Sequence, residues 1–350
     1  MKTSSLRFVF SFCLILIVSC DEPETVVTNF VYRDGSIRRT VEMRSGKQDF
    51  RQSQIQVPVD STWTIEDTLT ISEKGDTTWI RTAEKLFGSA AEINTGYSAD
   101  SSCNSRVKRQ AALDRKFRWF NTIYRYSEKI DRIFSNGYPV SEFLNEEELL
   151  WYYTPWNEQE AKRNGIDSTK YRALSDSVNR RTNDWFFNSV VAEWIYEFTG
   201  QIQKKDQVLI AADTLKAWEK NLLSLTLKNE QDFDTQWENG SILEAAIGRE
   251  LSMKYRSEAD SSLELVEEKI GLPFKQYSMR IAMPGKLIGS NGFADSCKVL
   301  LWTVTSDYFL TEDYVMWAES RVANIWAWIM SGAFVVFVFT GLIIRKKKRD

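Results

Sequence analysis

Histidine is missing from all 350 residues of the chain. Its absence excludes every Ser-His-Asp and Cys-His catalytic arrangement, the HExxH zinc motif and any histidine general base. No glycine-rich phosphate-binding loop follows a predicted strand. Most familiar hydrolase mechanisms are therefore excluded, and the sequence points to no catalytic residue and no cofactor.

Cysteine is scarce, with four residues in the chain. Two of them lie in the N-terminal segment, which leaves Cys103 and Cys297. In an oxidising compartment such a pair most simply forms one disulfide, although spacing alone does not show whether the two Cα atoms come close enough. A reactive thiol or a metal ligand is the alternative. Because neither cysteine has a CxxC partner and histidine is absent, we expect no metal site.

The N-terminal segment has the features of a secretory signal. Two basic residues precede the apolar stretch 8–18, which is too short to span a membrane. Ile17-Val18-Ser19-Cys20 resembles the lipobox of bacterial lipoproteins. We therefore expect residues 1–20 to form a lipoprotein signal peptide and Cys20 to be acylated, for example with palmitate. The alternative is an ordinary signal in which Cys20 is incidental.

The C-terminal segment predicts one membrane span. Residues 325–344 contain no charged side chain, and about 20 apolar residues cross a ~30 Å hydrocarbon core as a helix. The run Arg345-Lys346-Lys347-Lys348-Arg349 follows directly, and short basic flanks stay in the cytoplasm. We therefore expect a single-pass protein of the bacterial inner membrane, with residues 21–324 extracytoplasmic and the C-terminus cytoplasmic. Asp21 agrees with this, because it resembles a signal that retains some lipoproteins at the inner membrane.

Acidic residues slightly outnumber basic ones, 48 to 45, which gives a net charge of -3. Since the signal and the C-terminal tail are both basic, the part expected outside the cytoplasm is more acidic than this sum. A field of that sign disfavours nucleic acid and repels anionic lipid headgroups. We expect no nucleic-acid partner.

The first part of the outer region has the alternation of β-hairpins. Residues 26–43 turn at Asp34-Gly35-Ser36, and a second hairpin is expected from residues 63–72 and 77–87. A loop is expected at residues 96–104, which are rich in Ser, Gly and Asn. Residues 116–130 indicate one further strand.

Helical periodicity follows, from about residue 138 to residue 271. Asn145 and Glu148 have the spacing of a capping box. Apolar residues at three- and four-residue steps predict helices at 168–198, 206–225, 241–255 and 259–270. Strand patterns return at 277–283, 298–305 and 314–319.

Strands, then helices, then strands, without regular alternation, favour the α+β class. We expect an antiparallel sheet formed by N- and C-terminal strands with a helical insertion, plus one C-terminal transmembrane helix. The expected segments are the signal (1–20), an N-terminal β part (21–135), a helical block (136–272), a C-terminal β part (273–324), the transmembrane helix (325–344) and a basic tail (345–350).

Several short motifs resemble one known family. Met283-Pro284-Gly285-Lys286, Ser290-Asn291-Gly292 and Leu301-Trp302-Thr303, followed by the apolar span, are similar to the C-terminal half of LppM-type lipoprotein domains. The resemblance covers roughly a third of the chain, and the long helical block has no counterpart in it. It implies an α+β envelope protein with a lipid-facing or envelope-associated role, without supplying catalytic residues.

One cluster of carboxylates is a candidate for chemistry. Glu146, Glu147 and Glu148 precede Trp151-Tyr152-Tyr153 and Trp156. Two acids about 5 to 10 Å apart can cleave glycosides, and aromatic rings stack on sugars. The structural interpretation is that acids in the first turn complement the helix dipole while the rings pack a core.

The predicted helix at 168–198 leaves two similar choices. Trp185-Phe186-Phe187 and Trp194 could line an apolar ligand pocket, or they could form core. Glu193 and Glu197 lie one turn apart and could form a carboxylate pair, although such acids commonly lie on a solvated face.

The leading functional hypothesis is a membrane-tethered, extracytoplasmic envelope lipoprotein with a non-enzymatic binding or structural role near the membrane surface. Its partner would be the membrane and an envelope protein or lipid. The alternative is a carboxylate-dependent hydrolase acting on envelope glycan.

Overall fold

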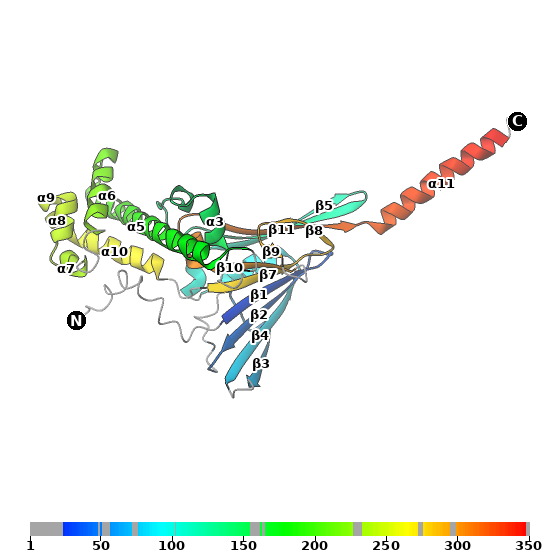
Figure 1. The fold of residues 1–350 in the computed structure, drawn as a ribbon, viewed down its shortest axis with the longest axis horizontal. Helices are drawn as coiled ribbons and strands as arrows, with labels where there is room; N and C mark the ends of the chain where they lie inside the picture. Colours follow the sequence, from blue (N-terminus) through cyan, green and yellow to red (C-terminus); the bar gives the residue numbers. More distant parts are fainter. Residues whose placement is uncertain are drawn as a thin grey trace. The chain divides into compact units, whose positions relative to one another are not determined.

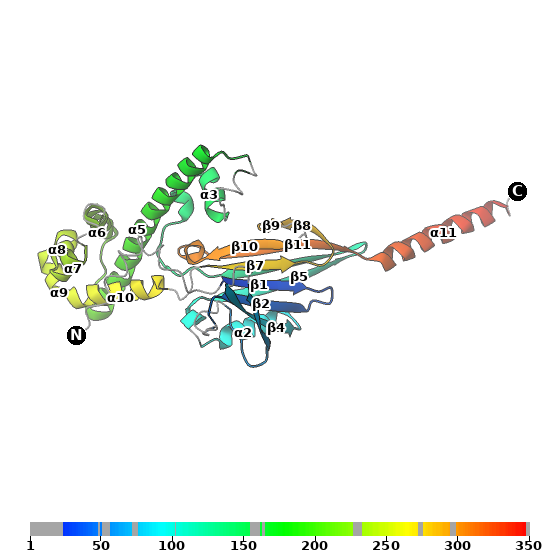
Figure 2. The ribbon, with the colours of Figure 1, turned by 60° about the horizontal axis from the view of Figure 1, so that its bottom comes forward.

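The computed structural model describes residues 24–47, 50, 57–71, 76–101, 103–154, 162, 165–226, 233–271, 276–294 and 299–347. They belong to two compact units (Figures 1 and 2). The helical unit contains Asp131–Gln276 and Thr303–Tyr314. The β unit contains Pro23–Ile130, Tyr277–Trp302 and Val315–Asp350.

The strands form two sheets. The seven-stranded sheet has the order β3 (Thr64–Ile71), β4 (Thr77–Phe87), β2 (Ile37–Ser45), β1 (Glu24–Val31), β7 (Gln276–Ala282), β10 (Leu300–Thr305) and β9 (Phe293–Ala294). The four-stranded sheet has the order β5 (Arg109–Arg118), β6 (Asn121–Ile130), β11 (Tyr314–Ala323) and β8 (Lys286–Ser290). This arrangement confirms the predicted α+β class.

Both predicted hairpins are confirmed. β1 and β2 are antiparallel, with Val31 opposite Ile37, and the turn between them is held by Asp34, whose carboxylate accepts from the N–H of Ser36 at 3.0 Å. β3 and β4 form the second antiparallel pair. Alternate residues of β2 are buried, which gives this strand one inward and one outward face.

β1 also pairs with β7, and this pair is parallel, with Val26 opposite Ser278. A parallel pair needs a long connection, and residues 32–275, which include β2 to β6 and the helical insertion, supply it. N- and C-terminal strands therefore share one sheet as predicted, but the pair that joins them is not antiparallel.

Two local predictions in the β unit are wrong. Residues 96–104 are not all loop, because helix α2 (Ala90–Ala99) includes Gly96. A tertiary contact holds this helix: the side chain of Asn94 donates to the carbonyl of Ala111 in β5 at 2.9 Å and accepts its N–H at 2.7 Å. The single strand expected at 116–130 is a hairpin of β5 and β6, joined by Trp119-Phe120.

The helical insertion is confirmed, with some different boundaries. Its helices are α3 (Glu146–Tyr153), α5 (Ser168–Asp206), α6 (Ala212–Thr226), α7 (Phe233–Glu238), α8 (Ser241–Ile247), α9 (Arg249–Lys254) and α10 (Arg256–Ile270). α5 continues eight residues past the predicted end. The helix predicted at 241–255 is divided at Gly248, whose φ of 89° lies in a region that glycine adopts readily.

Aromatic side chains form the core of the helical unit. Trp194 stacks on Phe198, with ring centroids 4.8 Å apart, and meets the edge of Trp237 at 5.6 Å. Trp185 is also buried. The core interpretation of Trp185 and Trp194 is therefore confirmed.

The chain continues from β11 into helix α11 (Ile325–Lys347), drawn in red in Figure 1. Residues Ile325–Lys346 form a helix long and apolar enough to cross a membrane. The predicted C-terminal span is confirmed to that extent.

Candidate membrane interface

The tip of the β5–β6 hairpin meets the start of α11. β6 and β11 are neighbours in the four-stranded sheet, and β11 leads through Asn324 into the helix. Trp119-Phe120, which connects β5 to β6, contacts the first turns of α11. Figure 1 shows the β5 hairpin close to the start of this helix. We call this contact the clamp; it consists of Phe117, Trp119, Phe120, Thr122, Asn324, Trp326, Trp328 and Ser331.

Asn324 makes most of the polar contacts of the clamp. Its side-chain amide donates to the carbonyls of Arg118 and Trp119 at 2.7 and 3.1 Å, and its side-chain oxygen accepts from Thr122 Oγ1 at 2.9 Å. Its backbone N–H donates to the carbonyl of Phe120 at 2.9 Å. Its own carbonyl accepts from Ala327 at 2.9 Å, which begins α11. One side chain thus joins the hairpin to the helix.

Aromatic rings make the apolar contacts. Phe117 and Trp119 pack on Trp326 with ring centroids 6.4 and 5.2 Å apart, and Phe120 packs on Trp328 at 4.4 Å. These rings nevertheless stay between 37% and 57% exposed. The clamp therefore leaves a large apolar surface uncovered beside a helix that could span a membrane.

The hairpin tip contacts α11 as far as its second turn. Trp119 donates its indole N–H to Ser331 Oγ at 2.9 Å. Ser331 lies six residues after Ile325, which is about 9 Å along a helix axis. If residues 325–344 fill the hydrocarbon core, the contact lies in its outermost part, next to the headgroup layer. Tryptophan is enriched at this level because it combines an apolar ring with a polar N–H.

A buried polar network lies in the β unit between strands of both sheets. Arg39 in β2 donates to Asn29 at 2.7 Å, to Tyr97 at 2.6 Å, and to Glu128 of β6 in a buried ion pair. Glu128 also accepts from Tyr97 at 2.8 Å and from Tyr126 at 2.5 Å. Both Glu128 oxygens and all three Arg39 nitrogens are engaged. The network therefore joins strands of the two sheets, and neither Arg39 nor Glu128 is available for a reaction.

The electrostatics of this network favour one protonation state. Burial raises the pKa of Tyr126 well above its usual value, and the charge of Glu128 adds to the effect. Burial alone would lower the pKa of Arg39, but the carboxylate of Glu128 raises it overall. The phenols stay neutral and the guanidinium stays charged. Sequence analysis missed Arg39, although its place among inward-facing Ile37, Val41 and Met43 signals a buried charge.

The carboxylates predicted as candidates have structural partners. Glu148 and Asn145 form the capping box expected at the start of α3. The other Glu148 oxygen accepts from Ser177 Oγ at 2.8 Å, and Arg181 lies 3.2 Å from this carboxylate. Glu147 pairs with Lys170 at 3.1 Å. The capping interpretation is confirmed for Glu148.

The neighbouring aromatic residues pack within the helical unit. Trp151 meets Tyr171 at 5.2 Å between ring centroids, and Tyr152 and Tyr153 meet Tyr308 at 5.1 and 5.0 Å. These rings are held by other aromatic rings, which agrees with the core interpretation. Trp156 lies outside the described residues.

Glu193 and Glu197 do not lie on a solvated face together. Lys269 of α10 donates to Glu193 at 2.5 Å and to Glu197 at 2.6 Å. Glu193 is fully buried and also accepts the N–H of Asn136 at 2.7 Å. The expectation of a solvated face is wrong for Glu193, because the cation that neutralises it comes from a helix distant in sequence.

The cysteine predictions stay predictions. Cys20 and Cys297 lie outside the described residues, as does the side chain of Cys103, although the backbone of Cys103 begins a short 3-10 helix, Cys103–Arg106. Within the described ranges, no group of three or more Cys, Asp or Glu side chains is placed to hold a metal ion.

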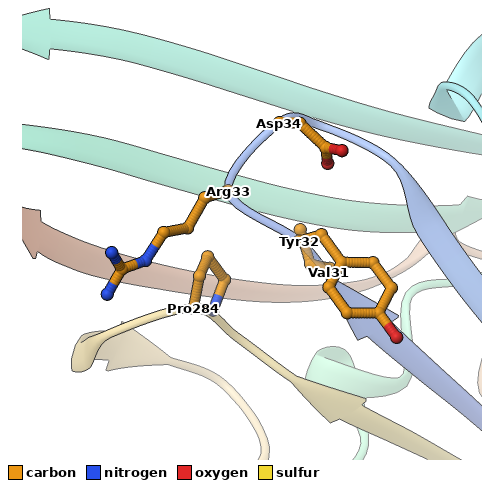
Figure 3. A pocket seen from close by; sticks show the side chains of 5 residues that line it. All are labelled: Val31, Tyr32, Arg33, Asp34 and Pro284. Carbon is orange, nitrogen blue, oxygen red and sulfur yellow. The ribbon is translucent and has the colours of Figure 1, made fainter.

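A shallow depression of about 540 Å³ lies between the β1–β2 turn and Pro284 (Figure 3). Val31, Tyr32, Arg33 and Asp34 line it. Hydrogen bonds from the side chain and backbone of Ser36 lower the pKa of Asp34. The carboxylate of Asp34 is therefore engaged in hydrogen bonds within its own turn.

No protein-family model matches the chain, and no curated protein matches it. Among solved structures, the chain is similar to the NMR structure of the folded domain of Mycobacterium tuberculosis LppM. The identity is 7%, the TM-score is 0.27, and the match covers 87% of this chain and 92% of that chain. This is a weak similarity at the level of the fold.

Proposed function

We propose that the protein is a membrane-tethered envelope lipoprotein of the LppM type whose β unit is held against the outer surface of the inner membrane. Its role is binding or structural rather than catalytic. The observation that carries the proposal is the clamp, in which the hairpin tip is fixed to the first turns of α11 while its aromatic rings stay exposed. A bilayer interface would cover those rings.

The engagement of the candidate carboxylates supports a non-catalytic role. Glu148 is used at a helix start, and Glu193 is neutralised by Lys269. Glycoside cleavage needs two carboxylates that converge on an open site. No observation in the described part of the chain favours the hydrolase over the membrane-surface protein.

Photo-crosslinking in the full-length protein tests the proposal. A photoreactive phenylalanine analogue replaces Phe120 at the hairpin tip, and in a control replaces Ile71, which is 69% exposed at the end of β3. We expect lipid adducts from position 120 and few from position 71. If position 120 gives only protein adducts or none, the clamp does not lie in the bilayer interface.

A further inference from the structure

The four-stranded sheet carries a group of cations at the end nearest α11. Lys116 and Arg118 end β5, Lys286 begins β8, and Arg321 lies near the end of β11. We call these four residues the cation patch. All four side chains are exposed, and none makes an ion pair with a described residue. Free charges of one sign at one end of a sheet create a local field that differs from that of the whole chain.

The register of the strands places the patch on the outer face of the sheet. The inner face carries buried side chains such as Tyr124 and Met316, and the patch residues alternate with these in their strands. Arg321 and Lys286 are directly opposite one another, so their side chains share this face.

Acidic residues on the same face lie further from α11. Asp114 precedes Lys116 by two residues and is opposite Arg125, and Glu319 precedes Arg321 by two residues. The rows of side chains nearest Asn324 are therefore positive. The chain as a whole carries a negative net charge, which disfavours anionic lipid, but this end of the sheet is locally positive.

The patch lies at the height of lipid headgroups if the clamp lies in the interface. The carbonyl of Arg118 is bonded to Asn324, directly before α11, which places Arg118 at the start of the span. Lys116 is two residues higher, about 7 Å along a strand. Arg321 is three residues before Asn324. Long Lys and Arg side chains extend their charges toward the headgroup layer from such positions.

We propose that the cation patch binds the phosphates of anionic phospholipid headgroups in the leaflet that faces the β unit. This inference rests on the proposed function, because the clamp sets the height of the patch. The occupant is a lipid headgroup because the patch lies at the end of the sheet from which the apolar span begins and has the opposite charge to the phosphate. Each cation at an anionic surface contributes roughly 1 kcal/mol, or about a fivefold preference.

The test uses the purified full chain in vesicles of phosphatidylcholine that contain a small fraction of photoactivatable lipid. The probe is either phosphatidylglycerol or phosphatidylcholine with the same photoactivatable acyl chain. The measurement is the ratio of the two adduct yields. We expect a ratio of about five or more for the unmodified chain. The triple variant K116Q/R118Q/R321Q keeps Lys286 and should lower the ratio to what this one cation supports.

Two matched variants test whether the lipid preference depends on the position and the charge of the patch residues. K204Q/K216Q/K220Q removes three exposed cations from the helical unit and should leave the ratio unchanged. K116R/R118K/R321K keeps the charges and should also keep the ratio.

Failure of this inference can be distinguished from failure of the proposed function. A ratio near one for the unmodified chain, with adducts from both lipids, overturns this inference and leaves the proposed interface intact. An equal loss of preference in the control triple variant also overturns it, because the preference then follows total charge. Absence of any lipid adduct near the clamp contradicts the proposed function itself.

Discussion

Asn324 is hydrogen-bonded to Phe120, with its backbone N–H 2.9 Å from the Phe120 carbonyl oxygen. The residue before α11 is thereby fixed to a hairpin tip that is distant in sequence. The same asparagine also holds the carbonyls of Arg118 and Trp119 through its side chain. Four hydrogen bonds of Asn324 therefore join the β5–β6 hairpin to the start of α11.

Substitution of Asn324 by alanine removes three side-chain hydrogen bonds at this junction. We expect the free energy of unfolding to fall by about 1 to 3 kcal/mol, since partners at a membrane junction lose their donors and acceptors. Thermal unfolding of the full chain in detergent measures the change. Asn179→Ala, at an exposed position in α5, is the control and should change stability by no more than about 0.5 kcal/mol. Equal effects of the two substitutions would contradict the role given to Asn324.

The buried pair of Arg39 and Glu128 predicts strong non-additivity. Arg39→Met leaves a buried carboxylate without its cation, which costs about 3 to 5 kcal/mol. The double variant R39M/E128Q should be less destabilised than the sum of the single variants, because the unpaired charge is gone. Denaturant unfolding of the four proteins gives the coupling. Additive effects would show that the two side chains do not act as a pair.

Lys269 is predicted to stabilise the helical unit by neutralising Glu193. Lys269→Met should destabilise by about 3 to 5 kcal/mol, and adding Glu193→Gln should recover part of the loss. Lys254→Met is the matched control, since its pair with Asp206 is exposed and such pairs contribute about 1 kcal/mol or less. If the two lysine substitutions have the same effect, the burial of Glu193 is not maintained in solution.

Tyr138 predicts a loss of stability in alkali. Its burial and its hydrogen bond to Glu219 raise its pKa to about 12. An unfolded tyrosine loses its proton near pH 10, so between about pH 10 and 12 the unfolded state binds fewer protons than the folded state. The stabilisation is complete below pH 10 and decreases as pH rises through that window. Tyr138→Phe should make the decrease shallower, measured by denaturant unfolding across the window; an unchanged slope would contradict the assignment.

Local signals in the sequence account for several elements. Asp34-Gly35-Ser36 predicts the β1–β2 hairpin because the side chain of Asp34 closes its own turn. The spacing of Asn145 and Glu148 predicts the start of α3 for a similar reason. The uninterrupted apolar stretch predicts α11 by its length. Each of these depends on neighbours within a few residues.

Features that depend on distant residues were not predicted. Trp119-Phe120 carries no turn signal, and its turn is held by Asn324. The i,i+4 spacing of Glu193 and Glu197 does not reveal that Lys269 will bury one of them. The cation patch is spread over three strands, so net charge gave no indication of it. The aromatic residues at both parts of the clamp were visible in the sequence, but only the sheet order brings them together.

The central claim is that the hairpin tip lies in the bilayer interface, and quenching of tryptophan fluorescence by brominated lipids tests it most directly. The full chain is reconstituted with lipids brominated on the upper part of the acyl chain, as wild type, Trp119→Phe and the control Trp79→Phe, which alters the distal end of β4. We predict that the quenched signal falls in Trp119→Phe and is unchanged in Trp79→Phe. An unchanged quenched signal in Trp119→Phe would place the hairpin tip outside the bilayer and contradict the account.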